Sequence, residues 1–175
     1  MKKLIFGALA AALIMSCSQN SESGYVGVSD IQIENGVMTP ETLLALGRLS
    51  DPQLSPDGSK ILYGVSYNSI EDNRSCRNLF ICNVDGSGRT QLTRYAKSVS
   101  NARWSNDGSE IYFLQGDQLW KAAYKSGKLG RKVKLSDVQN GISEFKLSPD
   151  QSRIIYTSTI KNKAVRTPSD SDPAL

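Results

Sequence analysis

Leu54-Ser-Pro-Asp-Gly-Ser-Lys-Ile-Leu-Tyr63 decides the fold, because the chain carries this pattern three times without a gap. The second copy is Trp104-Ser-Asn-Asp-Gly-Ser-Glu-Ile-Tyr-Phe113, and the third is Leu147-Ser-Pro-Asp-Gln-Ser-Arg-Ile-Ile-Tyr156. The starts at positions 54, 104 and 147 lie 50 and 43 residues apart. Spacings of this length are typical of architectures that repeat one supersecondary unit.

Each copy predicts a β-hairpin. Pro sets φ at the first turn position, Asp binds the backbone beyond it, and Gly adopts φ > 0 without a steric cost. Short β-branched and aromatic runs on both sides favour strands. The serines that open these turns are therefore expected at sheet edges, open to solvent.

The agreement between the first two repeats continues beyond the hairpin. A third strand, a turn and a fourth strand align: Leu79–Val84 with Leu119–Tyr124, Asp85–Gly88 with Ser126–Gly130, and strand ends at Leu92-Thr93 with Leu135-Ser136. Four antiparallel strands in each repeat are the composition of a β-propeller blade. The predicted fold class is all-β: an incomplete β-propeller of about two and a half four-stranded antiparallel blades, preceded by a signal peptide and one short helix.

The repeat also divides the chain. Blade 1 is expected at residues 50–97, blade 2 at 98–140 and half of blade 3 at 141–160, followed by a disordered tail at 161–175. The first repeat has a longer connection, Asn68–Ser75, between its second and third strands. Because matching repeat positions have matching environments, Leu54 and Trp104 are both expected to be buried, and Leu147 to be more exposed at the incomplete end.

A short amphipathic helix and lead-in are predicted at residues 38–49. Thr39 is a good N-cap, Pro40 suits the first helical position, and Glu41 favours the positive end of the helix dipole. Gly47 is expected to close the helix.

The first residues read as an export signal. Lys2 and Lys3 precede the apolar run Leu4–Met15, which is too short to span a bilayer as a helix. Leu13-Ile-Met-Ser-Cys17 resembles the lipobox of bacterial lipoproteins. We therefore expect residues 1–16 to be a lipoprotein signal peptide and Cys17 to be lipidated, with the protein exported to the periplasm or outer membrane. An ordinary secretory signal is the alternative. Residues 17–37 are expected to form a flexible tether, since Ser18–Gly27 is small and polar.

The amino-acid composition excludes several kinds of catalytic and metal-binding site. Histidine is absent and the net charge is +4, so no Ser-His-Asp triad, Cys-His pair or His-containing metal site is available. Cys76 and Cys82 flank a strand that spans roughly 20 Å, which predicts two free thiols rather than a disulfide. Scattered basic residues argue against nucleic acid as a partner. No catalytic residue, cofactor or metal ligand is predicted.

The segment Met38-Thr-Pro-Glu41 followed by Leu49-Ser-Asp-Pro-Gln-Leu-Ser-Pro-Asp-Gly58 resembles the N-terminus of prolyl-oligopeptidase-family serine peptidases. Their bacterial dipeptidyl-peptidase and acylaminoacyl-peptidase branch is the most similar, and WD40-like repeats of this type also occur in the TolB propeller. The resemblance implies a propeller followed by an α/β-hydrolase domain with a Gly-x-Ser-x-Gly motif. That motif is missing, because Asp85-Gly-Ser-Gly88 reads as a hairpin turn, so the chain itself is not expected to be an enzyme.

Two functional hypotheses follow. The chain is either the non-catalytic, substrate-gating propeller portion of an exported serine exopeptidase, or a TolB-like binding or scaffold propeller without enzymatic ancestry. In a full-length parent that acts on peptides, Glu71, Asp72 and Arg74 are candidate substrate contacts, although they also suit a solvated loop. Because propellers of this family close a ring of six to eight blades, the uncovered blade faces and edge strand predict association with another surface.

Overall fold

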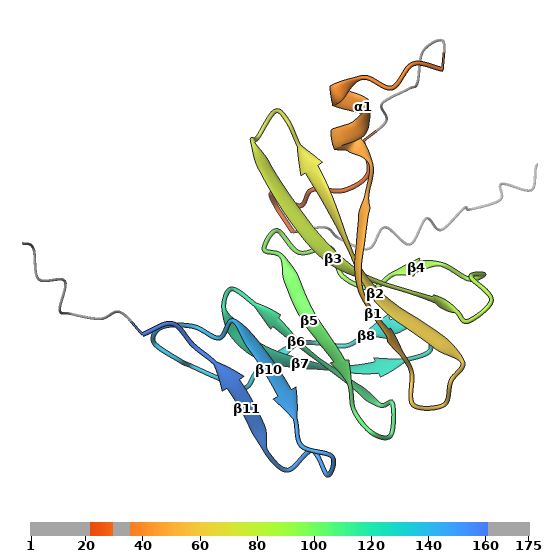
Figure 1. Cartoon of the computed structure of the whole chain (residues 1–175). Helices are drawn as coiled ribbons and strands as arrows, with labels where there is room; N and C mark the ends of the chain where they lie inside the picture. The colour runs from red at the N-terminus through yellow and green to blue at the C-terminus, as the bar shows by residue number, and fades with distance from the viewer. Residues whose placement is uncertain (1–21, 30–35, 161–175) are drawn as a thin grey trace, which may run out of the picture.

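The computed structural model describes residues 22–29 and 36–160, and its strands form three antiparallel sheets (Figure 1). Sheet 1 has the order β1 (Arg48–Leu54), β2 (Lys60–Ser69), β3 (Arg74–Asn83) and β4 (Thr90–Gln91). Sheet 2 comprises β5 (Val99–Trp104), β6 (Glu110–Gln115), β7 (Gln118–Lys125), β8 (Lys128–Leu129) and β9 (Val133–Lys134). Sheet 3 pairs β10 (Glu144–Leu147) with β11 (Ile154–Thr157). The predicted all-β antiparallel class is confirmed, and within the described residues the sheets do not close into a ring.

The repeated turns are built from one set of hydrogen bonds. Ser55 Oγ donates to Asp57 Oδ1 (2.6 Å) and accepts from the Lys60 amide (2.9 Å). Asp57 Oδ1 also accepts from the Ser59 amide (3.1 Å), and Gly58 takes φ +72°. The turns that begin at Ser105 and Ser148 repeat these bonds.

This arrangement corrects the expectation that the turn serines are open to solvent. Ser55 and Ser105 are buried, at 7% and 5% exposure, because each hydroxyl lies inside its turn between a carboxylate and an amide. Ser148 is half-buried in the third turn. The serines hold the hairpins together rather than presenting their hydroxyls at the surface.

The third turn carries Gln151 where the others have glycine. Gln151 takes φ +56°, a conformation that costs a non-glycine residue about 1–3 kcal/mol. Its side-chain amide donates to the Trp104 carbonyl (3.1 Å) and accepts from the Asn106 amide (3.0 Å). These bonds join sheet 3 to sheet 2 and offset the backbone strain.

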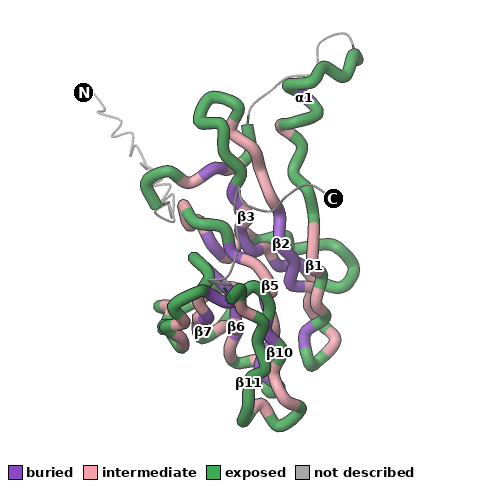
Figure 2. Tube along the Cα trace, turned by 60° about the vertical axis from the view of Figure 1, so that its left-hand side comes forward, coloured by how far each residue is buried: buried purple, intermediate pink, exposed green. Residues whose placement is uncertain are grey.

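Successive sheets pack through equivalent faces. One face of sheet 1 buries Leu62, Leu79 and Ile81 against Trp104, Ile111 and Phe113 of sheet 2. The other face of sheet 2 buries Leu114 and Leu119 against Ile142 and Phe145, which precede and begin sheet 3. By repeat position, Tyr112 of this second face corresponds to Leu62 of sheet 1. Each sheet therefore uses the same face toward its successor, and most of the buried hydrophobic residues lie along these two contacts (Figure 2).

The expectation that Leu54 is buried like Trp104 is wrong. Leu54 is 59% exposed, whereas Trp104 is 9% exposed. Leu54 lies on the face of sheet 1 that corresponds to the Trp104 face of sheet 2, which packs on sheet 1. No earlier sheet covers this face of sheet 1 in the described chain. Leu147, the third matching residue, is half-buried against the Leu114–Phe145 cluster.

Two strand boundaries differ from the expectation. Half of the connection Asn68–Ser75 is strand, because β2 and β3 stay paired up to Ser69 and Arg74 and leave a four-residue turn. The fourth strand of the second repeat is split into β8 and β9, which both pair with β7 on either side of residues 130–132. Sheet 2 therefore has five strands where four were expected.

The helix α1 (Pro40–Ala45) begins as predicted and ends differently. Thr39 Oγ1 accepts from the Thr42 amide (3.2 Å) as the N-cap. At its C-terminal end Leu46 is extended, with φ −63° and ψ 130°, so Gly47 does not close the helix. A Cβ at Gly47 would lie 2.7 Å from the Tyr67 ring, which shows that this glycine permits a close approach to β2.

The segment that precedes α1 is partly docked. The Glu22 amide donates to the Arg94 carbonyl (3.0 Å), Gln91 Nε2 donates to the Tyr25 hydroxyl (2.7 Å), and Val26 is 7% exposed. Residues 22–26 therefore dock on sheet 1 and on the chain that follows it, which corrects this part of the expected 17–37 tether. The predicted signal peptide at 1–16, the lipidation site Cys17 and the tail at 161–175 lie outside the described residues. In the part of the chain that is described, no helix is long and apolar enough to cross a membrane.

We predict that two isoleucines at the same repeat position contribute unequally to stability. Ile111 is fully buried between sheets 1 and 2, while Ile61 lies on the uncovered face of sheet 1. Ile111→Val should lower the free energy of unfolding by about 1 kcal/mol, and Ile61→Val by less than half as much. Urea unfolding followed by circular dichroism measures both, and equal losses would contradict the packing of sheet 2 on sheet 1.

We also predict acid sensitivity from the repeated turns. Hydrogen bonds from Ser105 and Ser109 lower the pKa of Asp107 from 3.8 to about 2, and Asp57 and Asp150 are held similarly by their own serines. A carboxyl whose pKa is depressed on folding stabilises the fold above its unfolded pKa. This stabilisation should be lost as the pH falls from about 4 to about 2.

Asp107→Asn should reduce that loss by about a third, since three turns contribute comparably. Glu71→Gln, at an exposed carboxylate outside these turns, is the control. The free energy of unfolding of each variant, measured with urea between pH 5 and pH 2, is compared with that of the wild type. An unchanged acid response in Asp107→Asn would show that the turns do not cause it.

Candidate functional site

The proposed substrate-loop residues lie at the tip of the β2–β3 hairpin, but they do not form one group. Glu71 and Asp72 are exposed in the turn, where Ser69 Oγ donates to Asp72 Oδ2 (3.0 Å) and accepts from the Asp72 amide (3.1 Å). Arg74 instead donates from Nη2 to the carbonyls of Gly24 and Ala96. Arg74 therefore fastens the N-terminal segment to sheet 1, while the two carboxylates stay at the tip.

A surface cavity of about 400 Å³ borders this acidic tip. Its lining comes from three segments that are distant in sequence: Tyr25–Ser29, Ala45 and Asn68–Asp72. The docking of residues 25–29 creates the cavity, since these residues form one of its walls. A contact between Glu71 or Asp72 and a substrate stays a prediction.

A second group of side chains lies where the outer edges of sheets 1 and 2 meet. The Lys132 ammonium lies 3.9 Å from the centroid of the Tyr95 ring and 5.3 Å from that of Trp120. Lys132 Nζ also donates to Gln115 Oε1 (2.6 Å) and forms an ion pair with Glu22 Oε1 (3.5 Å). One lysine thus joins β6, β7, the end of sheet 1 and the N-terminal segment.

Two aromatic rings and a carboxylate surround the ammonium group of this lysine. A cation over an aromatic face gains about 0.5–2 kcal/mol, depending on how far it is removed from water, and only 25% of the Lys132 side chain is exposed. Trp120 is oriented by its own hydrogen bond, because its Nε1 donates to the Gln115 carbonyl (3.0 Å). Burial, and then the Glu22 carboxylate, raise the pKa of Tyr95, so its hydroxyl stays protonated at neutral pH.

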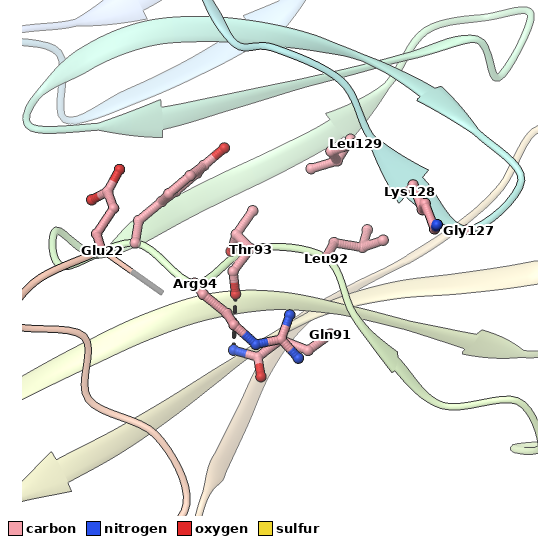
Figure 3. Close-up of a pocket in the computed structure, with 9 residues that line it drawn as sticks. Glu22, Gln91, Leu92, Thr93, Arg94, Gly127, Lys128 and Leu129 are labelled. Atoms are coloured by element: carbon pink, nitrogen blue, oxygen red, sulfur yellow. Dashed lines mark hydrogen bonds between the residues drawn. The ribbon is translucent and has the colours of Figure 1, made fainter. Parts of the chain in front are cut away.

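A cavity of about 410 Å³ adjoins this junction and is shown in Figure 3. Glu22 lies on one side of it and Lys128 on the other, and Arg94 and Thr93 come from the chain after β4. The sequence alone does not reveal this site, because the small polar stretch around Glu22 predicts a flexible tether. The signal that could have indicated it is the dense run of basic residues that follows Tyr124.

The uncovered face of sheet 1 forms a third feature, a shallow apolar groove of about 680 Å³. Tyr63 stacks on Phe80 with ring centroids 5.9 Å apart, and Tyr67 meets the edge of Phe80 at 6.5 Å. Cys82 is buried in this cluster, and Cys76 donates to the Tyr95 carbonyl (3.2 Å). Both are free thiols, as expected from their spacing.

A metal-binding cluster and an activated serine are two arrangements that can be looked for among the described residues. Among them no group of three or more His, Cys, Asp or Glu side chains could hold a metal ion. The serine hydroxyls nearest to carboxylates belong to the repeated turns, where the acceptor Asp57 has a pKa of about 2. Such a carboxylate is a weak proton acceptor at neutral pH and does not activate a nucleophile.

Comparison with known proteins defines the class to which this arrangement belongs. The chain is a homologue of prolyl-oligopeptidase-family (S9) serine peptidases, and it matches only a part of them. Dipeptidyl-peptidase 5 of Porphyromonas endodontalis is 35% identical over 131 residues, which are 73% of this chain and 19% of that protein. Dipeptidyl-peptidase 5 of Porphyromonas gingivalis is 33% identical over 163 residues, covering 92% of this chain and 23% of that protein.

Solved structures agree on the fold. An acylaminoacyl peptidase of Pyrococcus horikoshii superposes with a TM-score of 0.57 at 21% identity, over 75% of this chain and 20% of that one. No family model matches the sequence. The chain spans about a fifth of the length of the curated relatives it matches. The predicted resemblance to this peptidase family is confirmed.

We predict that Glu22 holds the N-terminal segment against the sheets. Its Oε2 accepts from the Ala96 amide (3.0 Å), so Glu22→Ala should speed hydrogen exchange of that amide about tenfold while leaving the β2–β3 ladder unchanged. Glu71→Ala, at an exposed carboxylate in the β2–β3 turn, is the matched control. If both variants leave the Ala96 amide equally protected, the segment is not held by Glu22.

Proposed function

We propose that this chain is the non-catalytic N-terminal propeller portion of an exported S9-type serine exopeptidase. The observation that carries the proposal is its homology to a limited part of the dipeptidyl-peptidases described above. On this proposal sheets 1 and 2 are the first two blades, and sheet 3 is the inner half of the third.

The packing between sheets supports the assignment to a propeller. Blades of a propeller repeat around an axis, so each blade meets its successor through the same face. Sheet 1 meets sheet 2, and sheet 2 meets sheet 3, through corresponding faces. The exposed side chains at both ends fit the same series. Leu54 lies on the face that a preceding blade would cover, and Ile155, at 73% exposure, lies on the face that a following blade would cover.

The absence of histidine supports a non-catalytic role. A serine hydroxyl needs an adjacent base to lose its proton at neutral pH, and peptidases of this kind use histidine. The chain has none in any of its 175 positions and has no Gly-x-Ser-x-Gly motif. Any peptidase activity of the parent would come from a hydrolase domain that this sequence does not contain.

In the parent, the propeller would gate the access of peptides and help to position them. The Glu71–Asp72 tip supports this role, because two exposed carboxylates beside a cavity can bind the positively charged N-terminus of a peptide. Arg74 contributes indirectly, since its bonds to the Gly24 and Ala96 carbonyls hold a wall of that cavity.

Export and anchoring complete the proposal. The signal at residues 1–16 and the lipobox-like Cys17 would attach the protein to a membrane of the cell envelope through acyl chains, facing the periplasm or on the outer membrane. Stable anchoring requires more than one chain, and a lipoprotein cysteine carries several. The uncovered groove of sheet 1 and the edge strand β11 are the surfaces available for association with another blade or protein.

A TolB-like binding propeller without enzymatic ancestry is the second candidate, favoured by the same Ser-Pro-Asp-Gly repeats. The two differ in what the gene encodes beyond this chain. A downstream reading frame with Gly-x-Ser-x-Gly and a later histidine fits the peptidase, and its absence fits the binding propeller.

We predict that the purified mature chain, starting at Cys17, does not hydrolyse aminoacyl, dipeptidyl or acylaminoacyl reporter amides above the buffer rate. The measurement is release of the chromogenic group over hours. Turnover that survives repurification and is abolished by a serine-directed inhibitor would overturn the non-catalytic proposal.

A further inference from the structure

The positive charge of the chain is concentrated on the outer edge of sheet 2. Residues 118–136, which contain β7, β8 and β9, include six lysines and arginines and no acidic residue. The whole chain has a net charge of +4, so the rest of it is net acidic. The expectation that basic residues are scattered fails for this segment, and the pairing of β8 and β9 with β7 gathers its cations along one edge.

Half of these cations are neutralised within the fold. The three that form ion pairs with carboxylates are Lys121, Lys132 and Lys134. Lys125, Lys128 and Arg131 are exposed and form no ion pair with a carboxylate of residues 22–29 or 36–160. Lys125 and Lys128 are register partners at the start of the β7–β8 hairpin, and Arg131 follows β8. Three uncompensated cations therefore project from one short edge.

This edge is close to the place where the chain would leave the body toward Cys17. Glu22 is held by the Arg94 carbonyl, the Ala96 amide and Lys132. Cys17 lies five positions before Glu22, so at most about 17 Å of extended chain separates the two residues. Glu22 and Lys128 line the same cavity (Figure 3). Acyl chains on Cys17 would consequently hold the edge of sheet 2 near the lipid headgroups.

We propose that the edge formed by Lys125, Lys128 and Arg131 is a membrane-contact surface that binds anionic phospholipid headgroups. Its orientation in the cell rests on the proposed acylation of Cys17, whereas its affinity for an anionic surface does not. Each Lys or Arg near such a surface strengthens binding by about fivefold at low salt. The contact would thus fix how the anchored protein stands on the membrane, with β8 and β9 toward the lipid and β1, β5 and β10 away from it.

The first experiment measures binding without the anchor. The mature chain carrying Cys17→Ser is sedimented with vesicles of phosphatidylcholine alone or with 40% phosphatidylglycerol. We expect at least tenfold stronger partitioning onto the anionic vesicles in 50 mM salt, and most of this preference should disappear in 0.5 M salt. Equal partitioning onto both kinds of vesicle would overturn the proposal.

A matched pair of variants separates the edge from net charge. Lys125→Glu, Lys128→Glu and Arg131→Glu together should weaken anionic binding by about a hundredfold or more. Arg89→Glu, Lys146→Glu and Arg153→Glu change the net charge equally at exposed cations outside the edge, and should weaken binding less than fivefold. Circular dichroism verifies that both variants keep the β-sheet spectrum. Equal losses would show that the edge has no special role.

The second experiment tests orientation on the acylated protein. A fluorophore is placed at Ser126→Cys in the β7–β8 turn or at Ser143→Cys beside β10, since Cys76 and Cys82 are buried. Headgroup-quencher lipids in anionic vesicles should quench the first label at least threefold more strongly than the second. Equal quenching would contradict the orientation. Mass spectrometry shows independently whether Cys17 is acylated. An unmodified cysteine refutes the proposed acylation, while the sedimentation result still decides whether the edge binds anionic lipid.

Discussion

The structure depends on the packing of one sheet face against the next. An isolated four-stranded sheet leaves one or both apolar faces in water, and the first repeat can bury Leu62, Leu79 and Ile81 only because the second supplies Ile111 and Phe113. Sheet 2 in turn depends on sheet 3, because Phe145 packs against Leu114 and Leu119 on its other face. At the two ends of the described series no neighbouring sheet covers the outer face, so Leu54 and Ile155 remain exposed. The stability of each repeat is therefore set by its neighbours as much as by its own sequence.

Polar groups keep the sheets in register with one another. Arg103 donates to both carboxylate oxygens of Asp51, at 3.0 and 2.9 Å, and so links β5 to β1. Asp51 and Asn101 both take positive φ where the β1–β2 and β5–β6 pairings are irregular, which places equivalent bends in the two sheets. Gln151 makes the corresponding link between sheets 2 and 3 through side-chain amide bonds. The repeats thus share a framework but use different side chains to fasten it.

The sequence predicted the parts of the fold that local chemistry determines. The Ser-x-Asp-Gly turns, the four successive strand positions and the Thr39 cap all follow from residues within a few positions of one another. It did not predict what depends on the absence of a neighbour, such as the exposure of Leu54. It also missed contacts that join distant segments. The Glu22–Lys132 pair and the docking of residues 22–26 give no periodic signal, because an acidic residue in a small polar stretch looks like solvent-exposed chain. Of the proposed loop site, the sequence located the acidic tip but not the separate role of Arg74.

The contact between Glu22 and Lys132 bridges 110 residues, whereas every strand pairs with a strand that is nearby in sequence. Local pairings form first in folding, since closing a long loop costs more chain entropy than closing a short one. The first sheet can therefore assemble as soon as its own strands have emerged, but the N-terminal segment has no lysine to bind until β9 has been placed. The N-terminal segment can therefore dock first on the chain that follows sheet 1, through the Arg94 carbonyl and the Ala96 amide, and gains its ion pair with Lys132 only after sheet 2 has formed.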